Sequence, residues 1–153
     1  MEFKKLTLAV AISSALLTAC GGGGGGGGSG STSSTPATYS VSGTAAKGII
    51  QHGIVTAKEY VGTNWNTVGT STTDENGDYS LLLSGYAGGI LKIEITAGAN
   101  TTMKCDGSSG CGNAAFGQSV ALPQNFTMAA VLPAFSTGTL TRTTVTPYTN
   151  MAA

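Results

Sequence analysis

The feature that most constrains the fold is the strict alternation of apolar and polar residues from Leu91 to Thr96. Successive side chains of a β-strand point to opposite faces, so this pattern predicts a strand that buries Leu91, Ile93 and Ile95. The other face of this strand is polar and is expected to meet water. Since no stretch after Ala37 repeats apolar residues every three or four positions, we predict an all-β fold.

Short alternating segments of the same kind recur along the chain, separated by Gly, Asn and Asp. This spacing predicts an antiparallel β-sandwich of about seven strands within a domain at residues 38–146. The strands are expected near residues 39–42, 53–61, 67–73, 78–84, 91–96, 126–131 and 138–145. Asp74 to Gly77 is expected to form a hairpin turn, with Gly77 at positive φ. Ile49 and Ile50 are expected to enter the core from a loop.

Residues 1–19 have the composition of an export signal. Lys4 and Lys5 precede an apolar run from Leu6 to Leu17, which is too short to span a bilayer as a permanent helix. The four residues that end in Cys20, Leu-Thr-Ala-Cys, resemble the lipobox of bacterial lipoproteins. The resemblance implies that the signal is removed and that Cys20 becomes a lipidated first residue, with acyl chains such as palmitate. The alternative is an ordinary secretory signal with a chance cysteine near its cleavage site.

Residues 20–37 comprise Cys20 and a Gly/Ser-rich segment that begins with eight consecutive glycines. Glycine buries no side chain and loses the most backbone entropy on ordering, so we expect a flexible tether. About 17 residues of such a coil have an r.m.s. reach on the order of 20–25 Å. By resemblance to lipoprotein sorting signals, a glycine rather than an aspartate after Cys20 implies delivery to the outer membrane.

Four segments of the expected sandwich carry a further pattern, in which a strand ending in threonines is followed by an Asp/Asn/Gly turn and a Tyr-x-Leu strand. They are residues 41–43, 47–50, 53–57 and 72–81. These segments resemble the carboxypeptidase regulatory-like (prealbumin-like) β-sandwich, and the resemblance covers residues 39–95. It implies a prealbumin-like or immunoglobulin-like sandwich that serves as a non-catalytic accessory module of enzymes, transporters and surface proteins.

With Cys20 assigned to lipid, Cys105 and Cys111 remain, separated by a short Gly/Ser-rich segment. Two such thiols in an exported chain are expected to oxidise, so we predict a structural disulfide. The alternatives are a redox pair or half of a metal site. The spacing is not Cys-x-x-Cys, and the sequence offers no evident third and fourth soft ligand.

The charged residues offer little to catalysis or to nucleic-acid binding. The residues after Ala19 include five basic and six acidic side chains, a net charge of −1 with His52 neutral, so we expect no nucleic-acid partner. His52 is the only histidine and is predicted to be a surface or turn residue. Asp74, Glu75 and Asp78 could gather around Ca²⁺, but a solvated turn is favoured. We therefore expect no catalytic residues, no cofactor and no metal.

Trp65 admits two interpretations, because it lies between Asn64 and Asn66 in a region where two strands meet. It can cap one end of the core, which we favour for so small a sandwich. It can instead form, with Tyr60 and Tyr86, a platform on which a sugar ring stacks.

The last residues predict the start of a helix, with Thr146 as N-cap and Pro147 at the first helical position. A similar segment follows the sandwich in large lipoproteins, so residues 147–153 are expected to open a longer helical part.

The sequence as a whole predicts a lipid-anchored spacer or interaction module facing the cell surface or the periplasm, with a membrane contact through Cys20 and a surface protein or glycan as partner. The alternatives are a carbohydrate-binding module, or the non-catalytic N-terminal domain of a surface enzyme or transporter.

Overall fold

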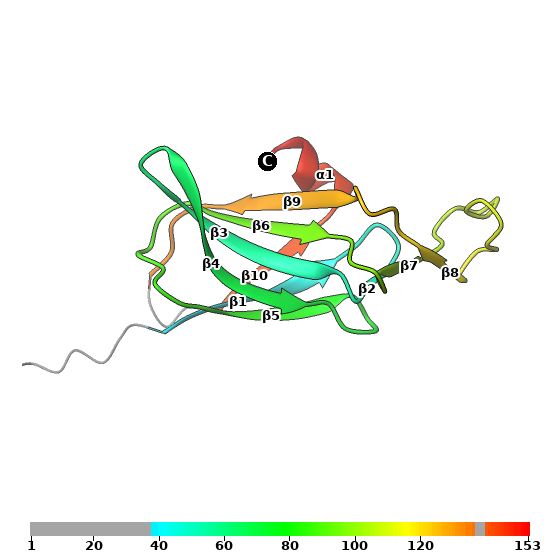
Figure 1. Ribbon diagram of the computed structural model, residues 1–153, viewed down its shortest axis with the longest axis horizontal. Helices are drawn as coiled ribbons and strands as arrows, with labels where there is room; N and C mark the ends of the chain where they lie inside the picture. The colour runs from blue at the N-terminus through cyan, green and yellow to red at the C-terminus, as the bar shows by residue number, and fades with distance from the viewer. Residues whose placement is uncertain (1–37, 137–139) are drawn as a thin grey trace, which may run out of the picture. The chain divides into compact units, whose positions relative to one another are not determined.

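The computed structural model describes residues 38–136 and 140–153 (Figure 1). Residues Thr35–Ala153 group into one compact unit. The predicted signal, Cys20 and the Gly/Ser segment lie outside the described residues. The unit Thr35–Ala153 is an all-β sandwich, which confirms the predicted fold class.

Two larger sheets pack face to face, and a small sheet adjoins one end (Figure 1). The four-stranded sheet is antiparallel and runs in the order β4 (Asn64–Thr72), β3 (Ile54–Val61), β6 (Leu91–Thr96), β9 (Thr127–Leu132). The three-stranded sheet has the order β10 (Leu140–Val145), β1 (Tyr39–Ala45), β5 (Asp78–Leu83). The small sheet has the order β2 (Ile50–Gln51), β7 (Thr102–Lys104), β8 (Ser119–Ala121), and helix α1 spans Pro147–Met151.

All seven predicted strands are present, and their alternation fills the core as expected. Leu91, Ile93 and Ile95 of β6 are fully buried, and the inward residues of β5 are at most 5% exposed. The three short strands of the small sheet are not among those predicted from the sequence. The parallel pairing of β10 with β1, from Ser40 opposite Leu140 to Ala45 opposite Val145, was not predicted either.

The predicted turn at Asp74–Gly77 forms, with Gly77 at φ 78°, but it does not make a hairpin. The Asp74 carboxylate accepts the backbone N–H groups of Asn76 at 2.8 Å and Asp78 at 2.9 Å. The strands on either side belong to different sheets, because β4 pairs with β3 whereas β5 pairs with β1. The turn therefore carries the chain across the open edge of the sandwich.

Ile49 and Ile50 differ in their burial. Ile50 is fully buried, whereas Ile49 is 41% exposed, so the prediction for Ile49 is wrong. The reason is that Ile50 begins the short strand β2, where it faces Met103. Adjacent residues of an extended chain point in opposite directions, so burying Ile50 turns Ile49 outward.

Gly43 lies where β1 and β10 come closest. The buried Tyr79 hydroxyl reaches over it and donates a hydrogen bond to the Thr143 carbonyl oxygen at 2.9 Å. A Cβ atom on residue 43 would stand 1.6 Å from that oxygen and 2.6 Å from the hydroxyl. Only glycine therefore permits this contact, and burial raises the pKa of Tyr79 so that the phenol remains a donor.

We predict that Gly43→Ala lowers the free energy of unfolding by about 3 kcal/mol, because β10 has to move to admit the methyl group. Ser42→Ala, on the outer face of the same strand, is the matched control and should change stability by less than about 0.5 kcal/mol. Chemical denaturation followed by circular dichroism measures both variants. Equal unfolding midpoints for the two would contradict the close approach at Gly43.

Candidate functional site

Strand β1 defines two opposite ends of the sandwich. Tyr39, where the N-terminal segment joins, pairs with Leu83, and we call this the proximal end. At the other end, Ala45 donates its N–H to the Gly77 carbonyl at 2.8 Å, and we call this the distal end. A strand rises about 3.3 Å per residue, so the two ends lie about 20 Å apart along β1.

The distal end carries an open groove of about 650 Å³, here called the distal groove. Its apolar wall comes from the loop after β1, from the loop between β7 and β8, and from the start of α1. The side chains that form this wall are Ala46, Ile49, Cys105, Phe116, Pro147 and Tyr148. Phe116 is 67% exposed and Tyr148 is 81% exposed, so the groove presents apolar surface to solvent.

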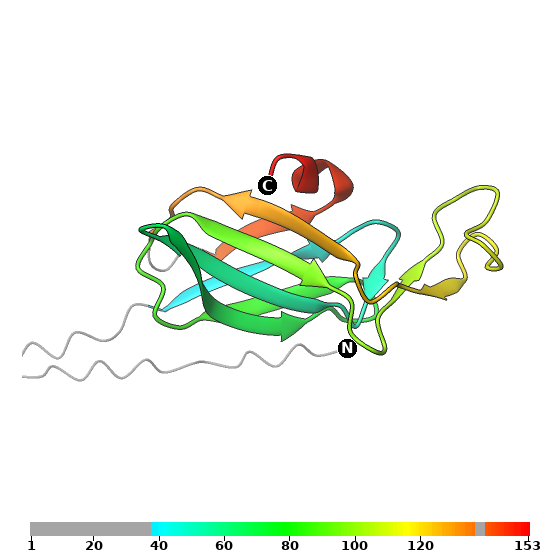
Figure 2. The ribbon, with the colours of Figure 1, turned by 45° about the horizontal axis from the view of Figure 1, so that its top comes forward.

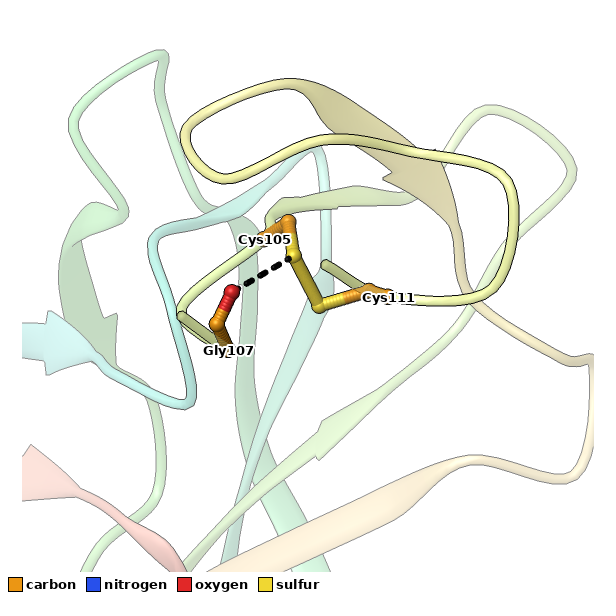
Figure 3. The surroundings of a disulfide bond; sticks show 3 residues. All are labelled: Cys105, Gly107 and Cys111. Atoms are coloured by element: carbon orange, nitrogen blue, oxygen red, sulfur yellow. Dashed lines mark hydrogen bonds between the residues drawn. A yellow bond between two sulfur atoms is a disulfide. The ribbon is translucent and has the colours of Figure 1, made fainter. Parts of the chain in front are cut away.

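A disulfide between Cys105 and Cys111 holds one wall of the distal groove, which confirms the predicted bond (Figure 3). The two Cα atoms are 5.6 Å apart, and Cys105 donates its backbone N–H to the Gln118 carbonyl at 2.8 Å. Figure 3 also shows Cys105 Sγ beside the Gly107 carbonyl oxygen, at 3.8 Å. The bond closes residues 105–111, the first part of the loop between β7 and β8, and Phe116 lies in the second part of the same loop.

Helix α1 forms another wall, and it begins where the sequence predicts. Thr149 donates its N–H to Thr146 Oγ1 at 3.2 Å, and Thr146 donates its N–H to Thr149 Oγ1 at 2.9 Å, which makes a capping box. The helix is tied to β9 by Asn150 Oδ1, which accepts the Ala129 N–H at 2.8 Å. These contacts hold in place the helix on which Tyr148 lies.

Trp65 lies at the proximal end and on the surface, so the favoured prediction of a core residue is wrong. Its side chain is 39% exposed, and its ring centroid is 5.2 Å from that of Tyr60. The pairing of β3 with β6 stops at Glu59, whereas the hairpin of β3 and β4 continues to Val61 and Asn64. Trp65 therefore sits on a part of the hairpin that projects beyond the neighbouring strand.

Tyr86 does not join Trp65 and Tyr60 in a common stacking platform. It is 6% exposed and packs edge-on against Tyr39, with ring centroids 4.8 Å apart, and against Phe135 at 5.0 Å. Burial raises the pKa of its hydroxyl. The sequence placed Tyr86 in a Gly-rich loop, where no periodicity distinguishes a buried ring from an exposed one.

Glu59 is a buried carboxylate that the sequence analysis did not single out. It is 3% exposed and accepts the N–H groups of Ala87 at 3.1 Å and Gly89 at 2.8 Å. A charge in an inward strand position needs such partners, because an unpartnered buried carboxylate is costly. The signal was available, since Glu59 continues the inward set of Val55 and Ala57. The carboxylate holds the loop that leads from β5 to β6.

Two lysines and Glu94 form a charged cluster on the outer face of the four-stranded sheet. Glu94 accepts a short hydrogen bond from Lys58 and lies 3.5 Å from the Lys92 ammonium. The Lys58 hydrogen bond, with the charge of both lysines, holds the pKa of Glu94 below its usual range. Lys92 Nζ also sits 4.9 Å from the centre of the Trp65 ring, which is within the range of a cation–π contact.

The residues weighed as catalytic or metal-binding candidates have structural partners. His52 Nε2 lies 3.1 Å from Glu75 Oε1, with the His52 side chain 51% exposed, which confirms the predicted surface turn. The Gln51 amide donates to the other Glu75 oxygen at 2.9 Å, and Asp74 closes its turn. Over residues 38–136 and 140–153, no three His, Cys, Asp or Glu side chains are grouped as metal ligands. Within the same residues, no helix is long and apolar enough to cross a bilayer.

Comparisons with known proteins add little to this description. No protein-family model matches the chain, and no curated protein matches it. Among solved structures, the chain is similar to a 9R-lipoxygenase from Cyanothece PCC8801, with 12% sequence identity and a TM-score of 0.38. The match covers 70% of this chain and 15% of the lipoxygenase. A likeness of this size carries no argument about activity.

We predict that Glu94→Gln destabilises the protein by about 1 kcal/mol at neutral pH and by less in acid. Because the folded-state pKa of Glu94 lies below the ordinary value of 4.5, its contribution is complete above that pH. The contribution is lost as the pH falls through the folded-state pKa. Urea unfolding at pH 7 and pH 3 measures the difference, and Asp106→Asn, at an exposed acid, is the control. A destabilisation that is the same at both pH values would contradict the ion cluster.

Proposed function

We propose that this protein is a lipid-anchored, non-catalytic accessory module that acts as a spacer and presents the distal groove to a surface protein. The observation that carries the proposal is the opposition of the two ends. The segment that follows Cys20 joins the sandwich at Tyr39, and the apolar groove lies at the other end of β1. An anchor at one end therefore leaves the other end free to meet a partner.

The anchoring half of the proposal rests on the sequence before Tyr39. The lipobox-like residues that end in Cys20 imply lipidation, and the glycine after Cys20 implies the outer membrane. Each buried CH₂ of an acyl chain adds about 0.8 kcal/mol to membrane binding, so several chains give stable attachment. The Gly/Ser-rich segment then supplies a reach on the order of 20–25 Å.

The non-catalytic, partner-binding part of the proposal rests on two groups of side chains, the carboxylates and the exposed apolar residues. A hydrolase would need carboxylates that are available as acids or bases. Those of Glu59 and Asp74 instead accept backbone N–H groups, and that of Glu75 accepts the Gln51 amide. Ile49, Phe116 and Tyr148 form exposed apolar surface in one place. Exposed apolar patches of this kind are typical of protein interaction sites. The expected partner is therefore a surface protein that offers an apolar segment.

We predict that Cys20→Ser converts the protein from a membrane-bound form to an uncleaved or soluble one. The serine cannot carry the thioether-linked lipid, so the acyl contribution to membrane binding is lost. Fractionation with detergent phase partitioning measures the change, and the mass of the N-terminal peptide reports the lipid directly. The double variant Cys105→Ser, Cys111→Ser is the control and should remain membrane-bound. If Cys20→Ser still partitioned into the membrane, the proposed lipid anchor would be contradicted.

We also predict that a photoreactive benzophenone residue at position 116 crosslinks in living cells to a discrete surface protein. The crosslink should disappear when Ile49→Ser and Tyr148→Ser are added, because these changes remove the apolar wall of the distal groove. Position 82 is the matched control, since Leu82 is 68% exposed but lies on β5, outside the groove. The same crosslinking pattern at both positions would show that the groove has no dedicated partner.

A further inference from the structure

A second group of exposed apolar side chains lies at the proximal end. Its members, here called the proximal patch, are Tyr60, Val61, Trp65 and Ile90. They are between 39% and 49% exposed, and three of them belong to the projecting hairpin of β3 and β4 (Figure 2). Tyr60 donates its N–H to the Ile90 carbonyl at 2.9 Å, which brings the fourth member beside the hairpin.

The proximal patch lies at the same end as the point where the N-terminal segment joins. Tyr39 packs against Tyr86, and Tyr86 donates its hydroxyl to the carbonyl oxygen of Gly89, next to Ile90. The strand directions agree with these contacts, since Thr72 and Asp78 are joined by the turn at the distal end. The opposite ends of β4 and β5, at Asn64 and Leu83, therefore both lie at the proximal end.

The chemistry of the patch suits the boundary between lipid and water. Trp and Tyr combine a large apolar ring with a polar atom, and both are enriched where a membrane meets water. Next to them lie Lys58, Lys92 and Glu94, and the buried Glu59 carboxylate offsets the second lysine, so the surroundings of the patch are balanced in charge.

We propose that the proximal patch docks on the headgroup interface of the same bilayer that holds the lipid on Cys20. This proposal rests on the lipidation proposed above. Four half-exposed side chains would not hold a soluble protein on a membrane. The anchor makes the second contact intramolecular, because a reach on the order of 20–25 Å keeps the patch close to the surface.

The patch is built to keep its shape while it docks. The Glu59 carboxylate holds the N–H groups of Ala87 and Gly89, which fixes the loop before Ile90. Tyr60 and Trp65 are directly opposite each other in the antiparallel pairing of β3 and β4. Docking therefore requires little additional ordering of the chain, and ordering is a main cost of weak association. Docking also directs the long dimension of β1, and with it the distal groove, away from the membrane.

Trp65 is the only tryptophan, so its fluorescence reports directly on the patch. The full lipidated chain is reconstituted in vesicles of phosphatidylcholine and phosphatidylglycerol, and the soluble Cys20→Ser chain with the same vesicles is the reference. We expect Trp65 emission to shift to shorter wavelength in the lipidated protein. Quenching by acrylamide should fall by roughly twofold or more, and lipids brominated near the headgroup should quench the emission.

Two double variants separate docking from anchoring. Val61→Ser with Ile90→Ser keeps Trp65 and should restore acrylamide quenching toward the reference, while the protein still floats with the vesicles. Ile49→Ser with Phe116→Ser, at the distal end, should leave the vesicle-bound fluorescence unchanged.

Each contrary result has a distinct meaning. A protein that floats with the vesicles while Trp65 stays fully accessible overturns docking and leaves the anchor intact. An N-terminal peptide without acyl mass overturns the anchor and docking together. Protection of Trp65 by bacterial surface glycans without vesicles, and none by vesicles, would assign the patch to a saccharide and overturn the membrane contact.

Discussion

The parallel pairing of β1 with β10 is the contact on which the arrangement of both ends depends. It joins segments that are about as far apart in the sequence as the sandwich allows, and it is possible only because residue 43 has no side chain. Tyr79 then crosses from β5 to the carbonyl oxygen of Thr143 and ties all three strands of the sheet together. Because β10 ends beside Ala45, helix α1 begins at the distal end and completes the groove there.

The sequence predicts the strands well because their information is local. The alternation in β5 and β6 depends only on which residues face a common core, and the capped start of α1 depends on two neighbouring residues. Strand partners are a different matter. The turn at Asp74–Gly77 has the composition of a hairpin, yet its flanking strands pair with β3 and β1, which is a long-range outcome. The composition of a turn specifies the reversal of the chain and not the sheet that receives it.

The candidate surfaces were predicted less completely, for a similar reason. Neither Trp65 nor Tyr86 lies in a run of alternating apolar residues, yet the hairpin at Trp65 projects beyond β6 whereas Tyr86 packs against Tyr39 and Phe135. Both outcomes depend on long-range contacts, which are the end of the β3–β6 pairing at Glu59 for Trp65 and the packing against Tyr39 and Phe135 for Tyr86. The disulfide was predictable from the expected export of the chain and from the number of its cysteines. Its place in the wall of the groove depends on how the loop of Phe116 lies relative to α1, which the sequence does not show. Glu59 could have been found, because a carboxylate in an inward register position calls for backbone donors.

The parallel alignment of β1 and β10 also has a mechanical consequence. A pull between the residues before Tyr39 and helix α1 would draw the start of β1 toward one end and the end of β10 toward the other. In parallel strands this load acts along the ladder, so the paired positions from Ser40–Leu140 to Ala45–Val145 share it and must yield together. An antiparallel pair loaded at one end would open one hydrogen bond at a time. The sandwich is thus arranged to bear, in shear, a tension applied between the start of β1 and the end of β10.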